Sequence, residues 1–248
     1  MNALTDYTLH LADNQLILGQ RLCEWCGHNF VLEQDIAMSN IALDLIGQAR
    51  SYYQYASKLD GKKSEDDLAM LRGEREYKNL LLLEQPNGDF ANTLARQFFY
   101  DVFHLFQLED HLKSSDESLR AIAEKAVKEV RYHVTWSSEW MIRLGDGTTE
   151  SHARLQHAVN KIWMWTGEMF EASAFEKDLI EKKIISNPKD FKLSWDQKIQ
   201  EILTEATLKL PLEEPYQHGG KDGLHTEHLG YILAEMQSLQ RTYPGLAW

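Results

Sequence analysis

Apolar residues recur every three or four positions along most of this chain, a spacing that gathers them on one face of an α-helix. The clearest stretch runs from Leu119 to Leu144, with charged residues such as Glu124 and Lys128 off the apolar face. His133 falls on that apolar face, between Val130 and Val134. We therefore expect His133 to point into the protein core.

The same periodicity predicts helices along the rest of the chain. They cover residues 3–26, 32–59, 66–83, 90–112, 151–174 and 189–208, a polar stretch after Glu176, and residues 225–243. Four of the five prolines fall between these helices, where proline does not interrupt helical hydrogen bonds. No strand-like alternation and no fixed-period repeat is sustained. The pattern predicts an all-α bundle, formed as a single domain over residues 1–248.

Charge and hydropathy exclude several classes of protein. The net charge of -12, without a basic stripe, argues against binding to a nucleic-acid backbone. No apolar run approaches the roughly 20 residues needed to span a bilayer, so we expect no membrane segment. The N-terminal residues carry Asp6 and Asp13 and lack the basic start of a signal peptide. We expect a cytoplasmic protein.

Cys23 and Cys26 form the one Cys-x-x-Cys spacing in the chain. That spacing occurs in redox motifs and in half of a zinc site, so a redox or zinc protein is one hypothesis. There is no second cysteine pair, and Leu22 and Trp25 indicate a packed helix end. We therefore expect two buried, reduced thiols.

Two groups of aromatic residues are candidates for anchors at a partner interface. The predicted helix over residues 90–112 is apolar on more than one side, as in a helix that is central or lies at a subunit interface. The candidates are Phe99, Phe103, Phe106, Trp163 and Trp165. Packing inside the monomer core is the alternative for both groups.

His225 and His228 share the first turn of the last predicted helix. Two histidines at this spacing could bind a metal ion. With Glu227 as the only carboxylate between them, capping, loop docking or contact with a partner is the favoured interpretation.

Four predicted helices each place one polar residue toward the core: Glu24, Gln48, Asp101 and His133. This layer resembles the di-iron carboxylate site of ferritin-like proteins, in which two helices each supply Glu-x-x-His. Here Leu45 and Val130 stand at the two glutamate positions, and Gln48 replaces one histidine. We expect no di-iron centre, and hydrogen bonds among the four polar residues instead.

Longer motifs make the chain similar to one family. They are residues 30–50 with NIALDLIGQAR from Asn40, EQPNGDFA from Glu84, KEVRYH from Lys128 and GGKDGLHTEHLG from Gly219. With them the whole chain resembles the C subunits of bacterial ring 1,2-phenylacetyl-CoA epoxidase, in the ferritin-like superfamily. The resemblance implies a ferritin-like bundle with additional C-terminal helices, in which the ligand slots of the catalytic relative are occupied by Glu24, Leu45, Gln48, Asp101, Val130 and His133.

The resemblance also implies a structural, non-catalytic role. The chain would hold a related di-iron catalytic subunit in its working conformation, within an oxidoreductase complex that contains a further small subunit. A reductase subunit with FAD and an iron-sulfur centre would supply electrons from NADPH. We expect no catalytic residue and no cofactor in this chain.

A different class of function remains as an alternative. Glu24, Asp101 and His133 are two carboxylates and an imidazole, a set that suits a single iron with open coordination positions. On that hypothesis the chain would be an oxygenase in its own right.

Overall fold

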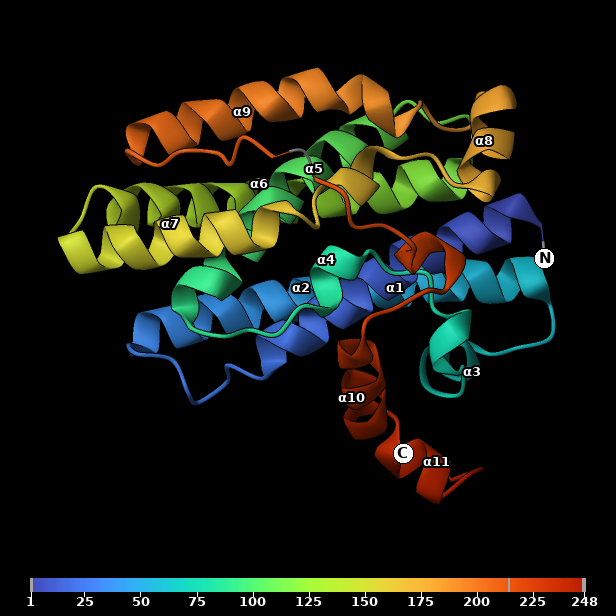
Figure 1. The fold of residues 1–248 in the computed structure, drawn as a ribbon. Helices are drawn as coiled ribbons and strands as arrows, with labels where there is room; N and C mark the ends of the chain where they lie inside the picture. The colour runs from blue at the N-terminus through green and yellow to red at the C-terminus, as the bar shows by residue number, and fades with distance from the viewer. Residues whose placement is uncertain (1, 214, 247–248) are drawn as a thin grey trace. The chain divides into compact units, whose positions relative to one another are not determined.

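The computed structural model describes residues 2–213 and 215–246. In this part of the chain the regular structure consists of 11 α-helices and short 3-10 turns, without strands (Figure 1). The predicted all-α class is confirmed. None of the described helices combines the length and the apolar character that crossing a membrane requires.

The chain divides into two compact units. The first contains Met1–Gln85 and Gly219–Trp248, and the second contains Pro86–His218. Each unit is a packed set of helices with its own contacts. A single domain over the whole chain stays a prediction.

In the first unit, the long helices α1 (Ala3–Cys23) and α2 (Leu32–Asp60) pack along each other (Figure 1). Gly19 lies where they come close, because a Cβ atom there would be 3.1 Å from the Ile46 side chain. Gly61 caps the C-terminal end of α2 in a left-handed backbone conformation that favours glycine. The shorter elements are α3 (Glu65–Met70), η1 (Glu74–Glu76), α4 (Leu81–Glu84), η4 (Gly220–Asp222), α10 (Glu227–Met236) and α11 (Ser238–Thr242).

Two helix predictions in the first unit were wrong. The continuous helix predicted over residues 66–83 is broken after Met70, and the chain is irregular before α4. Backbone N–H groups in this stretch bond to side chains instead: the Lys78 N–H donates to Asp13 (2.8 Å), and the Leu80 N–H to Asn14 (2.9 Å). The helix predicted over residues 225–243 begins at Glu227 and is divided at Gln237.

The second unit is built around α5 (Phe90–His111), which packs against three other helices. These are α6 (Glu117–Gly145), α7 (Thr149–Trp163) and α9 (Lys192–Glu205) (Figure 1). The connections contain η2 (Gly167–Phe170), α8 (Ala174–Glu181) and η3 (Pro188–Phe191). The helix predicted over residues 151–174 ends at Trp163, so that prediction was too long.

Side-chain caps fix where the helices of the second unit begin. The Asp89 carboxylate accepts a hydrogen bond from the Asn92 N–H (3.0 Å), and Asp116 accepts one from the Leu119 N–H (2.9 Å). At the other end of α6, a Cβ atom on Gly145 would overlap the Ala206 carbonyl group. Glycine thus allows the ends of α6 and α9 to touch.

Candidate functional site

Asp101 is the centre of a buried polar layer between α5 and α6. Its side chain is 1% exposed, and the Gln97 amide donates to its Oδ1 atom over 2.6 Å. Burial raises the pKa of Asp101 to about 7, against the opposing effects of nearby His133, Ser137 and Gln97. A substantial fraction of this carboxyl group is therefore neutral at physiological pH.

Two further histidines extend the polar face of α5. Burial lowers the pKa of His104 well below its usual range, and the charge of His133 acts in the same direction. Burial also lowers the pKa of His111 to about 4, although Asp110 and Asp116 oppose that change. Both imidazoles are therefore neutral at pH 7.

Of the six positions that the resemblance assigns to ligand slots, five are buried. They are Leu45, Gln48, Asp101, Val130 and His133. The prediction for Glu24 was wrong. α1 ends at Cys23, and Glu24 is exposed at its C-cap, where it forms an ion pair with Arg21 (2.9 Å).

The side chains of this layer do not fit a pair of iron ions. A di-iron site needs several carboxylates to neutralise and bridge the metals. Val130 is fully buried in this layer and offers no ligand; in the first unit, Leu45 is fully buried and Glu24 is exposed. Among the described residues, no three or more His, Cys, Asp or Glu side chains are grouped as a metal site.

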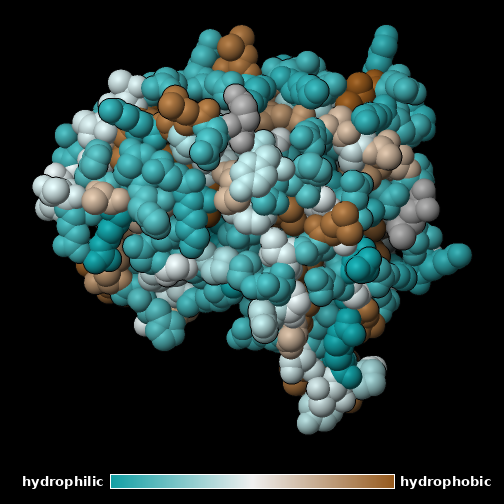
Figure 2. Space-filling view, viewed as in Figure 1, coloured by the Kyte–Doolittle hydropathy of each residue, from teal (hydrophilic) through white to brown (hydrophobic). Residues whose placement is uncertain are grey.

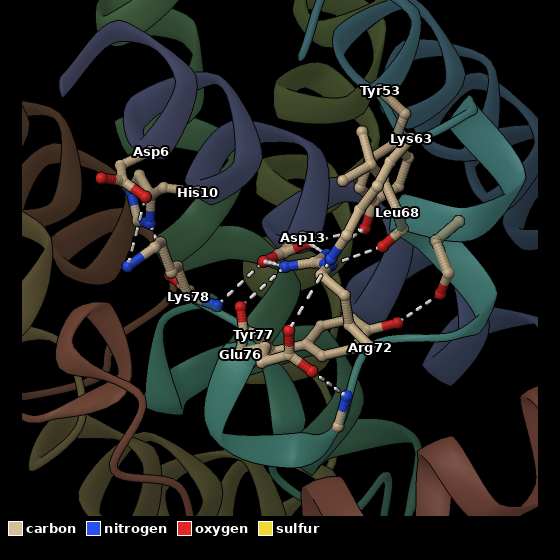
Figure 3. Close-up of polar contacts among 12 residues, drawn as sticks. Asp6, His10, Asp13, Tyr53, Lys63, Leu68, Arg72, Glu76, Tyr77 and Lys78 are labelled. Atoms are coloured by element: carbon tan, nitrogen blue, oxygen red, sulfur yellow. Dashed lines mark hydrogen bonds and ion pairs between the residues drawn. The ribbon is translucent and has the colours of Figure 1, made fainter. Parts of the chain in front are cut away.

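The first unit contains a buried ion pair that the sequence did not predict. Asp13 of α1 and Arg72, after α3, form a two-pronged contact, and their side chains are 0% and 3% exposed (Figure 3). The Tyr53 hydroxyl group donates to Asp13 over 2.6 Å, and the Arg72 guanidinium group lies 4.2 Å from the centre of the Tyr77 ring. Burial, together with the negative charge of Asp13, raises the pKa of Tyr53, so the phenol stays protonated. The cluster joins α1 and α2 to the irregular segment after α3.

A second buried cluster surrounds Glu84. Its carboxylate accepts hydrogen bonds from Asn79 (2.9 Å) and from the Thr226 N–H (2.6 Å), and His225 Nδ1 lies 2.8 Å from Oε2. His225 Nε2 lies 3.0 Å from the carbonyl oxygen of Tyr77. Since both ring nitrogens face oxygen acceptors, the geometry favours an imidazolium that donates twice. Burial alone would lower the pKa of His225, but the hydrogen bond and charge of Glu84 raise it.

The Glu84 cluster explains the glycine-rich motif that begins at Gly219. A Cβ atom on Gly220 would overlap the Asn79 carbonyl group, and one on Gly223 would overlap that of Arg75. Glycine lets this segment lie directly on the backbone before α4, with His225 inserted beside Glu84. For His225 and His228 the favoured interpretation was capping, loop docking or contact with a partner, and the contacts of His225 are those of loop docking.

Asp13, Arg72 and Glu84 were missed by sequence reasoning. One usable signal was the run of polar residues from Asp13 to Gln15 inside an otherwise apolar helix, all of which are buried. A second was Glu84, which directly follows four leucines and is 0% exposed. A charge at the end of a buried apolar run requires a partner.

Three of the proposed interface anchors lie in the core of the second unit. Phe99, Phe103 and Trp163 are 0%, 1% and 8% exposed. The Trp195 indole donates to the Phe99 carbonyl group over 3.0 Å, within an aromatic cluster of the same unit. The packing of these three residues agrees with the alternative, burial inside the core of the chain. Phe106 and Trp165 are half-buried, and their interface role stays a prediction.

The exposure of the two cysteines differs from the prediction. Both are free thiols, and both are exposed. The predicted helix to Cys26 would have buried them with Leu22, but α1 ends three residues earlier. The expectation of two buried thiols was therefore wrong.

Comparison with known proteins gives two matches over the full sequence. The sequence model of the family described as "Phenylacetic acid catabolic protein" matches residues 1–248. The C subunit of the 1,2-phenylacetyl-CoA epoxidase of Escherichia coli (strain K12) is 50% identical over 248 residues, which is 100% of both chains. With the helices described above, the family match supports the predicted ferritin-like, all-α fold class.

Proposed function

The chain belongs to the phenylacetic acid catabolic protein family, and on that premise we propose that it is the structural, non-catalytic subunit of a phenylacetyl-CoA epoxidase. The observation that carries this proposal is the 50% identity, over the whole of both chains, to a protein named as the C subunit of that enzyme. Its place would be in the breakdown of phenylacetate in the cytoplasm, where CoA thioesters and NADPH are available.

The side chains of the buried layer support a non-catalytic role. Val130 offers no metal ligand, and the Gln97 amide donates a hydrogen bond to the carboxyl group of Asp101. The neutral His104 and His111 continue that polar face along α5. Hydrogen bonding within this layer is sufficient reason for burying these groups, and it keeps the helices in one arrangement.

The chemistry of the complex would then reside in other chains. The proposed partner is a related catalytic subunit that holds the di-iron centre, binds the CoA thioester and epoxidises the aromatic ring with dioxygen. A further small subunit belongs to the same oxygenase. A reductase subunit with FAD and an iron-sulfur centre delivers electrons from NADPH. This chain contributes a surface that holds the catalytic subunit in its active conformation.

We place that surface on α2. Leu32, Ile36 and Leu43 are 69%, 52% and 65% exposed, and steps of four and seven residues put them on one helix face, here called the α2 apolar stripe. Exposed Phe30 precedes the stripe. Large exposed apolar side chains gathered on one face are a common sign of a protein interface.

The opposite face of α2 supports this assignment. Met38, Ile41 and Leu45 are buried there, so packing within the chain already uses one side of the helix. The face drawn in Figure 2 is mostly hydrophilic, with separate brown patches. The α2 apolar stripe thus lies on a helix whose position is fixed by its buried side.

Co-purification with the catalytic subunit from the same source tests the proposal. We expect the two chains, produced together, to elute as one complex in size-exclusion chromatography. The double substitution Ile36→Glu and Leu43→Glu should separate them, because the charges would have to be buried in the interface. Leu193→Glu is the matched control, since Leu193 is an equally exposed leucine (69%) on α9.

Each outcome bears on a different part of the proposal. If the unaltered chains elute separately, the structural-subunit function is wrong. If the complex forms but survives the double substitution, the subunit function stands and the α2 surface is wrong. Circular dichroism of the isolated variants separates loss of binding from loss of folding.

The alternative of a single-iron oxygenase receives less support. It requires Glu24, Asp101 and His133 as ligands, but Glu24 is exposed and paired with Arg21 while Asp101 and His133 are buried. The ligand set is therefore not assembled by the described side chains.

A further inference from the structure

Both cysteines of the chain lie in the turn that ends α1, and we propose that Cys23 and Cys26 form a reversible dithiol–disulfide site. The proposal rests on the backbone geometry of this turn and on the exposure of both thiols.

The turn holds the two cysteines at the separation that a disulfide needs. The Cys26 N–H donates to the Cys23 carbonyl group over 3.0 Å, and the same three-residue pattern joins Trp25 to Leu22 and His28 to Trp25. With about three residues per turn, side chains at positions i and i+3 lie one above the other. Such a turn brings the Cα atoms within about 7 Å, and disulfides join Cα atoms roughly 4.4–6.8 Å apart. Little backbone movement is therefore required.

Both thiols are accessible to reagents. Cys23 and Cys26 are free and exposed. Partial burial raises the pKa of Cys23, and the negative charges of Cys26 and Glu24 add to that effect. Cys23 is therefore mostly a thiol at neutral pH, and it is not the activated nucleophile of a catalytic cysteine.

A disulfide fits these residues better than a metal ion does. A structural zinc site takes about four ligands. In the described part of the chain no third His, Cys, Asp or Glu side chain completes a metal-binding group with this pair.

The oxidation balances with a peroxide as the oxidant. The thiolate of one cysteine attacks a peroxide oxygen and breaks the O–O bond, which leaves a sulfenic acid and releases hydroxide. The hydroxide takes up the proton that the thiol lost and leaves as water. The second thiolate attacks that sulfur and displaces hydroxide, which takes up a proton and leaves as water. Two thiols and one hydrogen peroxide give one disulfide and two water molecules. A dithiol reductant reverses the change by thiol–disulfide exchange.

The consequence of the disulfide is local. The ring encloses only the residues between Cys23 and Cys26, so the crosslink restricts the unfolded chain little and adds little global stability. It would fix the turn that carries Glu24, the partner of Arg21. Arg21 in turn donates to the Glu84 carbonyl group over 2.7 Å, so the turn is connected to the Glu84 cluster.

Intact-mass spectrometry of the full chain tests the proposal directly, because the sequence contains 2 cysteines. The reduced protein is treated with hydrogen peroxide, quenched with iodoacetamide and compared with an untreated sample. We expect a monomer that has lost two hydrogen atoms and accepts no alkyl group, with a peptide map that joins Cys23 to Cys26. Dithiothreitol should restore two alkylation sites.

Cys23→Ser and Cys26→Ser are matched controls, because neither can lose two hydrogen atoms in a monomer. They should instead give oxygen adducts or disulfide-linked dimers. If the unaltered chain gives only those same products, the proposal is overturned. Circular dichroism before and after treatment checks that the oxidised monomer is still folded.

Discussion

In the first unit the buried carboxylate of Asp13 faces the guanidinium group of Arg72, whereas in the second unit the buried carboxyl group of Asp101 is bonded to the amide of Gln97. A cation, a phenol and the Lys78 backbone N–H surround Asp13 and offset the cost of burying its charge. Asp101 instead has a pKa raised by burial to about 7. The comparison teaches that one chain uses two solutions to the cost of burying an acid, a matched ion and partial neutralisation.

Removing Arg72, the cation that faces Asp13, should have the largest effect on the free energy of unfolding. Arg72→Met leaves the charge of Asp13 buried without its ion partner, and breaking such pairs costs about 3–5 kcal/mol. Chemical denaturation at pH 8 measures the free energy of unfolding. The control is Arg50→Met, because the exposed pair of Arg50 with Glu65 should contribute about 1 kcal/mol or less. Equal losses in the two variants would contradict the assigned role of Arg72.

Replacing Asp101 and Asp13 by asparagine should change the stability of the protein in opposite directions. Asp101→Asn keeps the oxygen that accepts from Gln97 and removes the cost of a buried negative charge. Because the folded pKa of Asp101 is about 7, above its ordinary value, the stability of the unaltered protein falls as pH rises from about 4 to 7. Asp101→Asn should therefore add on the order of 2–4 kcal/mol at pH 8 and little at pH 4.

Asp13→Asn is the counterpart, and it should destabilise the protein at pH 8 because Arg72 loses its anion. Urea unfolding of both variants across this pH range makes the comparison. A destabilised Asp101→Asn variant at pH 8 would mean that the ionised carboxylate is needed in the folded protein.

Removing His225 from the Glu84 cluster should have a smaller effect on stability. The folded pKa of His225 is raised above its ordinary value near 6.5, so its contribution is complete below that pH and is lost as pH rises through the folded pKa. His225→Gln should cost about 1–2 kcal/mol at pH 6 and less at pH 9. Thermal unfolding at the two pH values measures the difference. His228→Gln is the control, since His228 makes none of the described contacts to Glu84, and the same pH dependence there would exclude this explanation.

Helical periodicity predicted most of the long elements and the inward direction of their polar residues. Asp101 and His133 are buried as expected, because each falls in the apolar row of a helix that runs for several more turns on both sides. Glu24 was misplaced because it lies just beyond the end of α1, where three-residue turns replace the helical repeat. Periodicity predicts whether a side chain faces the core only for residues within the continuous helix.

The contacts of the first unit could not be predicted in this way. Asp13 and Arg72 are 59 residues apart, and no local spacing connects them. The helix predicted through Arg72 failed because tertiary contacts outweighed its local preference: the guanidinium group donates to Asp13 (3.0 Å), and the Lys78 N–H donates to the same carboxylate (2.8 Å). Likewise, Glu84 and His225 are 141 residues apart.

The docking of Gly220 and Gly223 beside α4 affects the order in which this chain can fold during synthesis. In the sequence, the first unit flanks the second one, since residues after Gly219 complete what residues before Pro86 begin. On the ribosome, all residues of the second unit emerge while the first still lacks the imidazole for Glu84. The segment from Arg75 to Glu84 is therefore completed only after the second unit has emerged, and until then the incomplete first unit is open to aggregation and to chaperones.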